Sequence, residues 1–295
     1  MVPTSLLPVH AHPDDESLAT GGTIARYAAA GVRVILVTCT LGEHGEIIGE
    51  ELAGLAAERA DQLGGYRLAE LRAACTALGV DTHRFLGGIG RWRDSGMAGT
   101  AANADPRAFA AGDLDEQAAE LRKIIDEVRP DVLVSYDSGG GYGHPDHVRA
   151  HEVMMAAATG REHAVFWVVW ARSTIDQGVA ALARMPRLPF RLPRPGELPA
   201  LPDAVVTTTI DVAAYLPAKL AALRAHATQV AVWEGAEGQR AYALTDGVAR
   251  PVCAVEQFAL AQGRVDPAAV RTDLLGGLAG VAGLTGPAGV AEVTQ

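Results

Sequence analysis

The first half of the chain alternates short apolar runs with amphipathic stretches, and this alternation constrains the fold more than any other feature. Residues 32–40 contain the uninterrupted apolar run 34–37, which is typical of a strand buried on both faces of a parallel sheet. The pattern also predicts a strand over 5–10 and a helix over 16–30, which Gly31 would end. The first unit is therefore predicted to be β-α-β.

The same alternation continues along the chain. It predicts helices over 50–78 and 114–128 and another beginning near Asp146, with strands over 84–86, 132–136 and 166–170. These elements predict an α/β fold with a Rossmann-like, doubly wound, mostly parallel sheet.

The second half of the chain is less regular. Six prolines between Met185 and Asp203 argue for a loop, beyond which a strand over 205–210 and a helix over 215–226 are expected. The last twenty residues are rich in Gly and Ala, and we expect them to be frayed. We therefore expect a main Rossmann-like domain over 1–170 and a smaller C-terminal α/β extension over 171–295, packed on the same domain.

Composition excludes several classes of protein. The formal net charge is -10 and there is no long basic run, which argues against nucleic acids and anionic membranes as partners and favours a small molecule. Cys39, Cys75 and Cys253 are isolated, so neither a disulfide framework nor a thiolate zinc site is indicated. No secretory signal and no apolar run near the ~20 residues of a membrane span is recognisable, so we expect a cytoplasmic protein.

Histidines and carboxylates gather in two short segments, each directly after a predicted parallel strand. The segments are residues 10–16 (HAHPDDE) and 142–147 (YGHPDH). Open α/β sheets bind ligands at the carboxyl ends of their strands. In a Rossmann-like strand order the first and fourth strands are neighbours, so we expect these two loops to face each other.

Imidazole and carboxylate groups are the ligands of catalytic zinc, which uses three protein ligands and leaves one position open. We predict one divalent cation per chain, held by His12, Asp15 and His147, with Asp14 unligated beside it as a candidate general base. The same ligand set also suits ferrous iron, so Zn²⁺ is the first expectation and Fe²⁺ the alternative.

Each of the two segments also has a simpler interpretation. A single His or Asp after a strand is usually a helix cap or a turn residue, and only the pairing of two segments favours a metal site. His10 ends its strand and is expected to be structural. His151 follows His147 by one helical turn, but the Glu of an HExxH site is absent, so a supporting role is expected. The glycines at 139–141 match no phosphate-binding motif and are expected to bring Tyr142 over the pocket.

The residues HPDDE at 12–16 and HPDH at 144–147 together resemble the LmbE-like (PIG-L) deacetylase family. Further stretches resemble those members that deacetylate N-acetylglucosaminyl-inositol in mycothiol biosynthesis. They are residues 41–49, 61–67, 90–97, 140–144 and 225–230. The resemblance is close over 6–151 and patchy beyond it.

The resemblance implies a role for each matching position. Zinc would be held by His12, Asp15 and His147, and Asp14 would take a proton from water. Tyr142 would stabilise the tetrahedral oxyanion, while His144, oriented by Asp146, would protonate the departing amine.

The resemblance further implies that Arg67 and Asp94 contact the amino sugar and its inositol. The simpler interpretation is an ordinary ion pair. The expected products are acetate and a free amino sugar. Alternatives are a mycothiol S-conjugate amidase or another N-acetylglucosamine deacetylase of the same family, and then a non-enzymatic Rossmann-like binding module. The sequence leaves the oligomeric state open.

Overall fold

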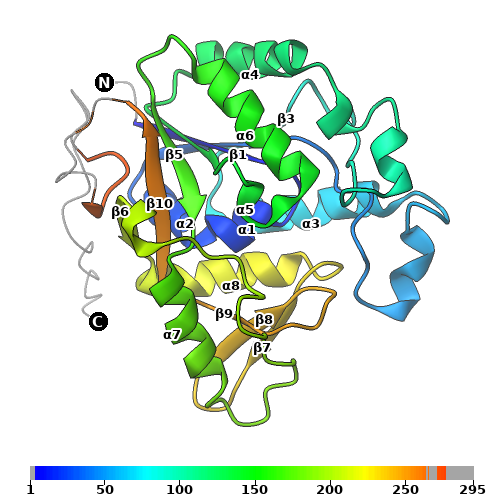
Figure 1. The fold of residues 1–295 in the computed structure, drawn as a ribbon, viewed down its shortest axis with the longest axis vertical. Helices are drawn as coiled ribbons and strands as arrows, with labels where there is room; N and C mark the ends of the chain where they lie inside the picture. The colour runs from blue at the N-terminus through cyan, green and yellow to red at the C-terminus, as the bar shows by residue number, and fades with distance from the viewer. Residues whose placement is uncertain (1–3, 264, 266–270, 277–295) are drawn as a thin grey trace, which may run out of the picture.

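The computed structural model describes residues 4–263, 265 and 271–276, and its centre is one seven-stranded sheet (Figure 1). In spatial order the strands are β3 (Thr82–Phe85), β2 (Arg33–Thr38), β1 (Ser5–His10), β4 (Val132–Tyr136), β5 (Ala164–Val169), β10 (Val255–Gln262) and β6 (Thr208–Asp211). The first five are parallel. This order confirms the predicted doubly wound α/β fold and makes β1 and β4 neighbours.

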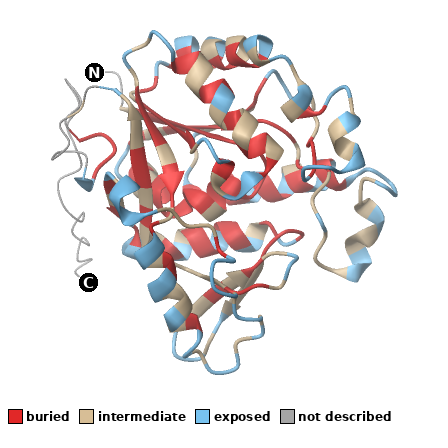
Figure 2. Cartoon of the chain, viewed as in Figure 1, coloured by how far each residue is buried: buried red, intermediate tan, exposed pale blue. Residues whose placement is uncertain are grey.

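Helices cover both faces of the sheet. On one face lie α4 (Leu114–Val128) and α6 (Pro145–Ala158), and on the other lie α2 (Gly21–Ala29), α3 (Leu63–Leu78) and α8 (Leu216–Ala225) (Figure 1). Successive residues of a strand point to opposite faces of the sheet. Leu6 packs against α2, α3 and α8, whereas Leu7 packs against α4 and α6. The central strands β2, β1, β4 and β5 are therefore buried on both faces, as Figure 2 shows, which explains their largely apolar character.

The C-terminal part of the chain adds strands to the same sheet. β10 pairs antiparallel with both β5 and β6, so residues beyond 170 extend the sheet that the first half begins. Sequence analysis did not identify β10. Its residues, VEQFALAQ, give no clear period of two, and its position is decided by pairing with distant strands.

The remaining elements surround this core. They are α1 (Asp15–Ala19), α5 (Gly140–Gly143), α7 (Arg172–Leu182), a small antiparallel sheet of β7 (Ala231–Glu234), β8 (Arg240–Ala243) and β9 (Arg250–Pro251), and the 3₁₀ helices Glu50–Leu55, Ala101–Ala104, Phe109–Ala111, Asp203–Val205 and Ala213–Tyr215. The proline-rich segment contains no regular helix or strand before Asp203, as predicted. Residues 277–295, on which the expectation of a frayed end falls, lie outside the described residues.

Two predicted helices are interrupted in the structure. The prediction of one helix over 50–78 was wrong, because only a 3₁₀ turn and α3 form and residues 56–62 separate them. Asp61 there adopts a left-handed backbone (φ 54°), which suits no helix, and its carboxylate pairs with Arg93. The predicted helix over 16–30 is divided into α1 and α2 at Thr20, whose φ of -133° is not helical, and the distant carboxylate of Glu256 accepts the N–H groups of Gly22 and Thr23 at the start of α2.

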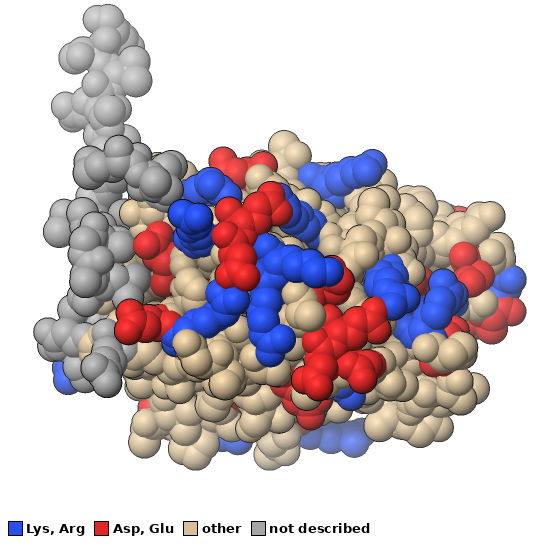
Figure 3. All heavy atoms as spheres, turned by 90° about the horizontal axis from the view of Figure 1, so that it is seen from above, with Lys and Arg blue, Asp and Glu red and all other residues tan. Residues whose placement is uncertain are grey.

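Charged side chains of both signs are interspersed on the face seen from above in Figure 3. α4 lies at the top of Figure 1, and its exposed acids make pairs such as Glu127 with Arg84 and Asp126 with Arg161. None of the helices in the described part of the chain combines the length and apolar character that crossing a bilayer requires.

Candidate active site

The two loops that carry the histidine and carboxylate motifs meet at the carboxyl ends of β1 and β4. The first loop leaves β1 after His10 and enters α1 at Asp15, and the second reaches α6 through Pro145. Because β1 and β4 are hydrogen-bonded neighbours, residues more than 130 positions apart in sequence come into contact. The structure thus brings His12, Asp15 and His147 together, as the sequence analysis expected.

Three donor atoms from these residues form a nearly equilateral triangle. His12 Nδ1 lies 3.3 Å from His147 Nε2, and Asp15 Oδ2 lies 3.4 Å from each of these two nitrogens. Ligands at about 2.0–2.1 Å from a tetrahedral zinc ion are about 3.3–3.4 Å from one another. The donor set therefore fits a tetrahedral cation that keeps a fourth position for another ligand.

The outer nitrogen of each histidine fixes its tautomer. His147 Nδ1 must donate to the carbonyl oxygen of Gly140 at 3.2 Å, and His12 Nε2 donates to Asp146 Oδ2 at 3.1 Å. In the neutral rings the inner nitrogens, His12 Nδ1 and His147 Nε2, consequently carry the lone pairs that a cation would accept. Hydrogen bonds of this kind orient metal-binding histidines in proteins.

His144 also lies close to these donors, because a ring nitrogen of His144 falls within 4.8 Å of nitrogens of both His12 and His147. Its Nδ1, however, accepts the backbone N–H of Asp146 at 3.1 Å, as the N-cap of α6. The neutral ring must then carry its hydrogen on Nε2, which makes that atom a donor rather than a ligand. His144 is better suited to contact a substrate than a cation.

The electrostatic potential at the triangle favours positive charge. Burial by itself would lower the pKa of His12, but Asp94, Asp146 and Asp15 together raise this pKa well above its ordinary value. Burial would likewise raise the pKa of Asp15, yet His147 and His12 hold it well below the usual range. A site that stabilises an imidazolium in this way also suits a divalent cation.

Asp14 has an unusual backbone beside the triangle. Its φ of 115° and ψ of -31° lie in a region that residues other than glycine rarely adopt. Its side chain makes no capping hydrogen bond to α1, although Asp14 is the N-cap residue. Burial raises the pKa of Asp14 to about 6, against the opposing influence of the Arg67 guanidinium. A carboxyl with a pKa in this range is suited to accept a proton near neutral pH.

Arg67 is buried, and it contacts the loop around Asp14 and the loop that follows β2. Its Nη1 donates to the carbonyl oxygen of Gly42 at 2.7 Å, and its Nη2 donates to the carbonyl oxygen of Pro13 and lies 3.2 Å from Asp14 Oδ2. Only 3% of its surface is exposed. The structure therefore places Arg67 as a support for Asp14, and the predicted contact with the sugar stays a prediction.

Asp94 and Asp146 lie on the far side of His12. Asp94 Oδ1 is 3.6 Å from His12 Nε2, and its oxygens accept the backbone N–H groups of His44 and Gly96. Asp146 contacts His144 through its backbone amide, while its carboxylate bonds to His12. The expected orientation of His144 by Asp146 thus comes from the backbone.

Tyr142 is half exposed and stands against the donor triangle. Its ring centroid is 4.9 Å from that of His147, with the two rings at 74°. Gly140 precedes it at a φ of 61°, where a Cβ would lie 2.8 Å from His147 Cβ, so this close approach requires glycine. The glycine-rich segment brings Tyr142 to the site, as the sequence analysis expected.

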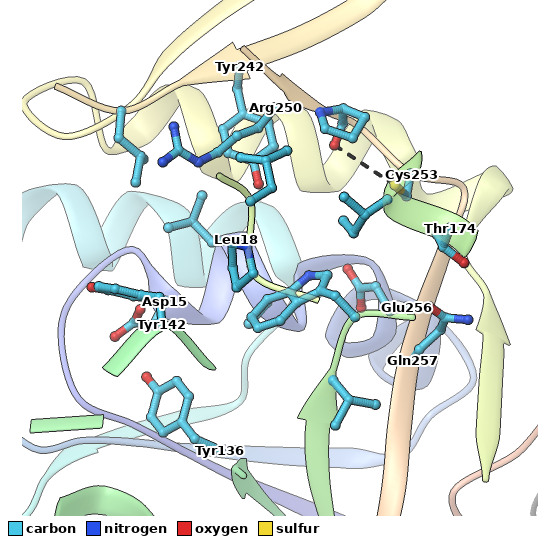
Figure 4. A pocket seen from close by; sticks show the side chains of 18 of the residues that line it. Asp15, Leu18, Tyr136, Tyr142, Thr174, Tyr242, Arg250, Cys253, Glu256 and Gln257 are labelled. Atoms are coloured by element: carbon cyan, nitrogen blue, oxygen red, sulfur yellow. Dashed lines mark hydrogen bonds between the residues drawn. The ribbon is translucent and has the colours of Figure 1, made fainter. Parts of the chain in front are cut away.

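A cavity of about 550 Å³ opens beside the triangle. Figure 4 shows Asp15, Tyr136 and Tyr142 on one side and Tyr242 and Arg250, from the C-terminal part of the chain, on the other. Much of the wall is apolar, including Leu18, Trp170, Ile175 and Leu198. Because Asp15 and His147 line the cavity, a small molecule there would reach a cation held by the triangle.

Sequence reasoning missed several residues that shape the site. Tyr136 ends β4, stacks on His147 at 4.2 Å and accepts the backbone N–H of Ala11. The sequence feature that could have indicated Tyr136 is its position as the last residue of a predicted buried strand, at the edge of the sheet where ligands bind.

Glu16 and His226 were also missed as a pair. They form a buried contact of 2.7 Å between the HPDDE motif and the end of α8. Burial would raise the pKa of Glu16, but His226, Ser17 and the Asp14 amide lower it to about 2. His10 and His151 instead contact Thr20 and the carbonyl oxygen of Tyr136, which agrees with supporting roles.

Comparison with known proteins extends these observations. The family model described as "PIG-L: GlcNAc-PI de-N-acetylase" matches residues 7–158. A relative from Actinosynnema mirum, named 1D-myo-inositol 2-acetamido-2-deoxy-alpha-D-glucopyranoside deacetylase, is 62% identical over 280 residues, which cover 94% of this chain and 98% of the relative. A relative from Saccharopolyspora erythraea, named 1D-myo-inositol 2-acetamido-2-deoxy-alpha-D-glucopyranoside deacetylase 1, is 56% identical over 294 residues. The match covers 95% of this chain and 96% of the relative.

Among solved structures, GalB, the 4-carboxy-2-hydroxymuconate hydratase from Pseudomonas putida KT2440, matches with a TM-score of 0.53 and 19% identity over 89% of this chain and 98% of that chain. This likeness concerns the fold alone. The match of the family model and the identity to the two deacetylases confirm the resemblance inferred from the HPDDE and HPDH motifs. The chain belongs to the PIG-L family of de-N-acetylases.

Proposed function

We propose that this protein is a metal-dependent deacetylase that hydrolyses the acetamide of N-acetylglucosaminyl-inositol, the reaction for which its relatives are named. The observation that carries the proposal is the triangle of His12, Asp15 and His147 donors, 3.3–3.4 Å apart, with Asp14 beside it and a cavity in front of it. Histidine and aspartate donors fit Zn²⁺, our proposed cofactor, and also Fe²⁺.

A divalent cation in this position would polarise the acetamide carbonyl and lower the pKa of a water molecule. Asp14 then accepts a proton from the attacking water, because its pKa of about 6 lets it be deprotonated at neutral pH. Tyr142 stands at the cavity beside His147 and donates its hydroxyl hydrogen to the developing oxyanion.

His144 acts in this proposal as a neutral hydrogen-bond donor. An imidazolium would carry a hydrogen on Nδ1, directed against the Asp146 N–H that this atom accepts. Burial and the neighbouring His12 and His147 also lower the pKa of His144 to about 4. Its Nε2–H therefore hydrogen-bonds to the reacting amide, and the proton collected by Asp14 passes to the departing nitrogen. This revises the role of proton donor that the resemblance implies.

The cavity supports an amino sugar as the substrate. Its volume of about 550 Å³ holds a small glycoside, and its aromatic and aliphatic walls suit the apolar faces of sugar rings. Walls come from both parts of the chain, so we propose that the catalytic domain, 1–170, and the extension, 171–295, form the site together. All three cysteines are free, and we propose the reducing cytoplasm as the location.

The test is acetate release by the purified protein, loaded with Zn²⁺ or Fe²⁺ in parallel, from N-acetylglucosaminyl-inositol. Free N-acetylglucosamine is assayed in the same way, and a bimane S-conjugate of mycothiol is assayed separately by cleavage of its glucosaminyl amide, which releases no acetate. We expect the highest kcat/KM for N-acetylglucosaminyl-inositol. Preferential cleavage of the bimane conjugate would instead establish an S-conjugate amidase, and no turnover of any of them would refute the deacetylase.

A further inference from the structure

The backbone of Asp14 needs support from its surroundings. Asp14 is one of four non-glycine residues with positive φ in the described chain, and its φ of 115° lies well beyond the 49–58° of the other three. A residue in such a region is strained, and it persists only when neighbouring contacts over-determine it. The question is which contacts hold the proposed base in this conformation.

Glu16 provides the contact on the amide side of Asp14. Its side chain folds back so that Oε2 accepts the Asp14 N–H at 3.0 Å, while Oε1 accepts the Ser17 hydroxyl at 2.5 Å. On the other side, Arg67 donates to the carbonyl oxygen of Pro13. The peptide group that enters Asp14 is therefore held at its N–H by Glu16 and at its oxygen by Arg67.

Glu16 is itself held from the far end of the chain. His226 follows the last residue of α8, and its Nε2 lies 2.7 Å from Glu16 Oε1 across a sequence separation of 210 residues. Both side chains are fully buried. A fully buried carboxylate is stable only with partners of this kind, so loss of His226 would release Glu16 from its present position.

We propose that His226 is a positioning residue for catalysis: it holds Glu16, which in turn holds the strained backbone of Asp14 so that the carboxylate faces the reaction centre. This inference rests on the proposed function, because it assigns Asp14 as the base. It makes the C-terminal extension part of the catalytic apparatus, in addition to its contribution to the cavity wall.

A purely structural role for His226 is the competing explanation, and the same turn offers a matched control. Thr228 lies two residues further on and donates from its hydroxyl to Glu70 Oε2 at 2.7 Å, while its N–H bonds to Glu70 Oε1 at 2.8 Å. These bonds anchor the turn to α3 without touching Glu16 or Asp14. Thr228→Val therefore weakens the turn and leaves the support of Asp14 intact.

The experiment compares His226→Ala, His226→Gln and Thr228→Val with the unaltered, metal-loaded protein. We expect His226→Ala to lower kcat by about 10- to 100-fold, the range that a small misplacement of a catalytic group produces. KM and metal content should stay within about twofold, since neither the cavity nor the donor triangle changes. Glutamine can donate to Glu16, so His226→Gln should recover most of kcat, and Thr228→Val should keep kcat despite a lower Tm.

Hydrogen–deuterium exchange gives a readout that does not depend on turnover. The Asp14 amide should exchange faster in His226→Ala, and not in Thr228→Val, because it loses the support of Glu16.

An unchanged kcat and unchanged exchange in His226→Ala would overturn the proposal, as would an equal loss of kcat in Thr228→Val. If the alanine variant does not fold, His226→Gln is compared with His226→Asn, because glutamine can donate to Glu16 and asparagine is too short to reach it. Equal kcat values in these two variants would refute the positioning role of His226. Absence of acetate release by the unaltered protein would refute the deacetylase, while the exchange result would still test the support of Asp14.

Discussion

His12 Nδ1 and His147 Nε2 lie 3.3 Å apart, although the two histidines are 135 positions apart in the sequence. A partner on the outer side of each ring, the Asp146 carboxylate or the Gly140 carbonyl oxygen, holds its hydrogen there. Both inner nitrogens therefore offer lone pairs to the same point, and Asp15 adds a negative oxygen. A cation at this point, or in its absence an added proton on His12, offsets the repulsion among these three electron-rich atoms.

Removal of the metal should abolish activity and lower thermal stability. A ligand present at 100 times its Kd stabilises the folded state by about 2.7 kcal/mol, so chelation should shift Tm downward and Zn²⁺ should restore it. Metal analysis of His147→Ala should find less than stoichiometric metal. His151→Gln is the control, because its ring bonds to the carbonyl oxygen of Tyr136 and not to the triangle. Stoichiometric metal in His147→Ala would contradict the assigned ligand set.

Asp14→Asn should retain the metal and lose turnover. Asp14 stands beside the donor triangle without belonging to it, and removal of a positioned base usually costs about 10²–10⁴ in rate. The measurement is kcat for acetate release together with metal content on the same preparation. Loss of metal along with activity would show that Asp14 is a ligand.

His144→Gln should retain more activity than His144→Ala. Glutamine keeps an N–H donor but cannot deliver a proton, so a hydrogen-bonding role for His144 predicts partial activity in this variant. A role as proton donor predicts the same large loss in both variants. Comparison of their kcat values at one metal occupancy separates the two mechanisms.

Arg67→Met should mainly lower kcat and stability. The guanidinium pairs with buried Asp14 and bonds to the carbonyl oxygens of Pro13 and Gly42, and breaking a buried pair costs about 3–5 kcal/mol. The free energy of unfolding in urea and the separate values of kcat and KM are the measurements. A large rise in KM with kcat preserved would instead support the direct substrate contact that the family resemblance implies.

Lys219→Met should destabilise the fold without affecting the metal. Lys219 Nζ donates to Glu256 Oε1 at 2.6 Å, and Glu256 also accepts the N–H groups of Gly22 and Thr23 at the start of α2. The single variant leaves a buried carboxylate without its cation, at a cost of about 3–5 kcal/mol. Lys219→Met combined with Glu256→Gln should recover much of this loss in urea denaturation. Equal losses in the single and double variants would argue against the buried charge as the cause.

The sequence by itself determined the first five strands, their Rossmann-like order and the residues that meet at the carboxyl ends of β1 and β4. These features are encoded locally, because apolar periodicity and short polar motifs reflect burial and chain direction at each point. The prediction of α4 over Leu114–Val128 agrees with its observed bounds for the same reason, since Asp113 caps it and its apolar residues recur at helical spacing.

Only the tertiary structure decided how those motifs are supported. Glu256 accepts amides at the start of α2, Glu16 and Arg67 hold the peptide group that enters Asp14, and His226 contacts Glu16 across a separation of 210 residues. Such contacts leave no periodic trace, because each depends on the packing of elements far apart in the chain. The antiparallel strand β10 escaped prediction for the same physical reason: its partners, β5 and β6, define it more than its own residues do.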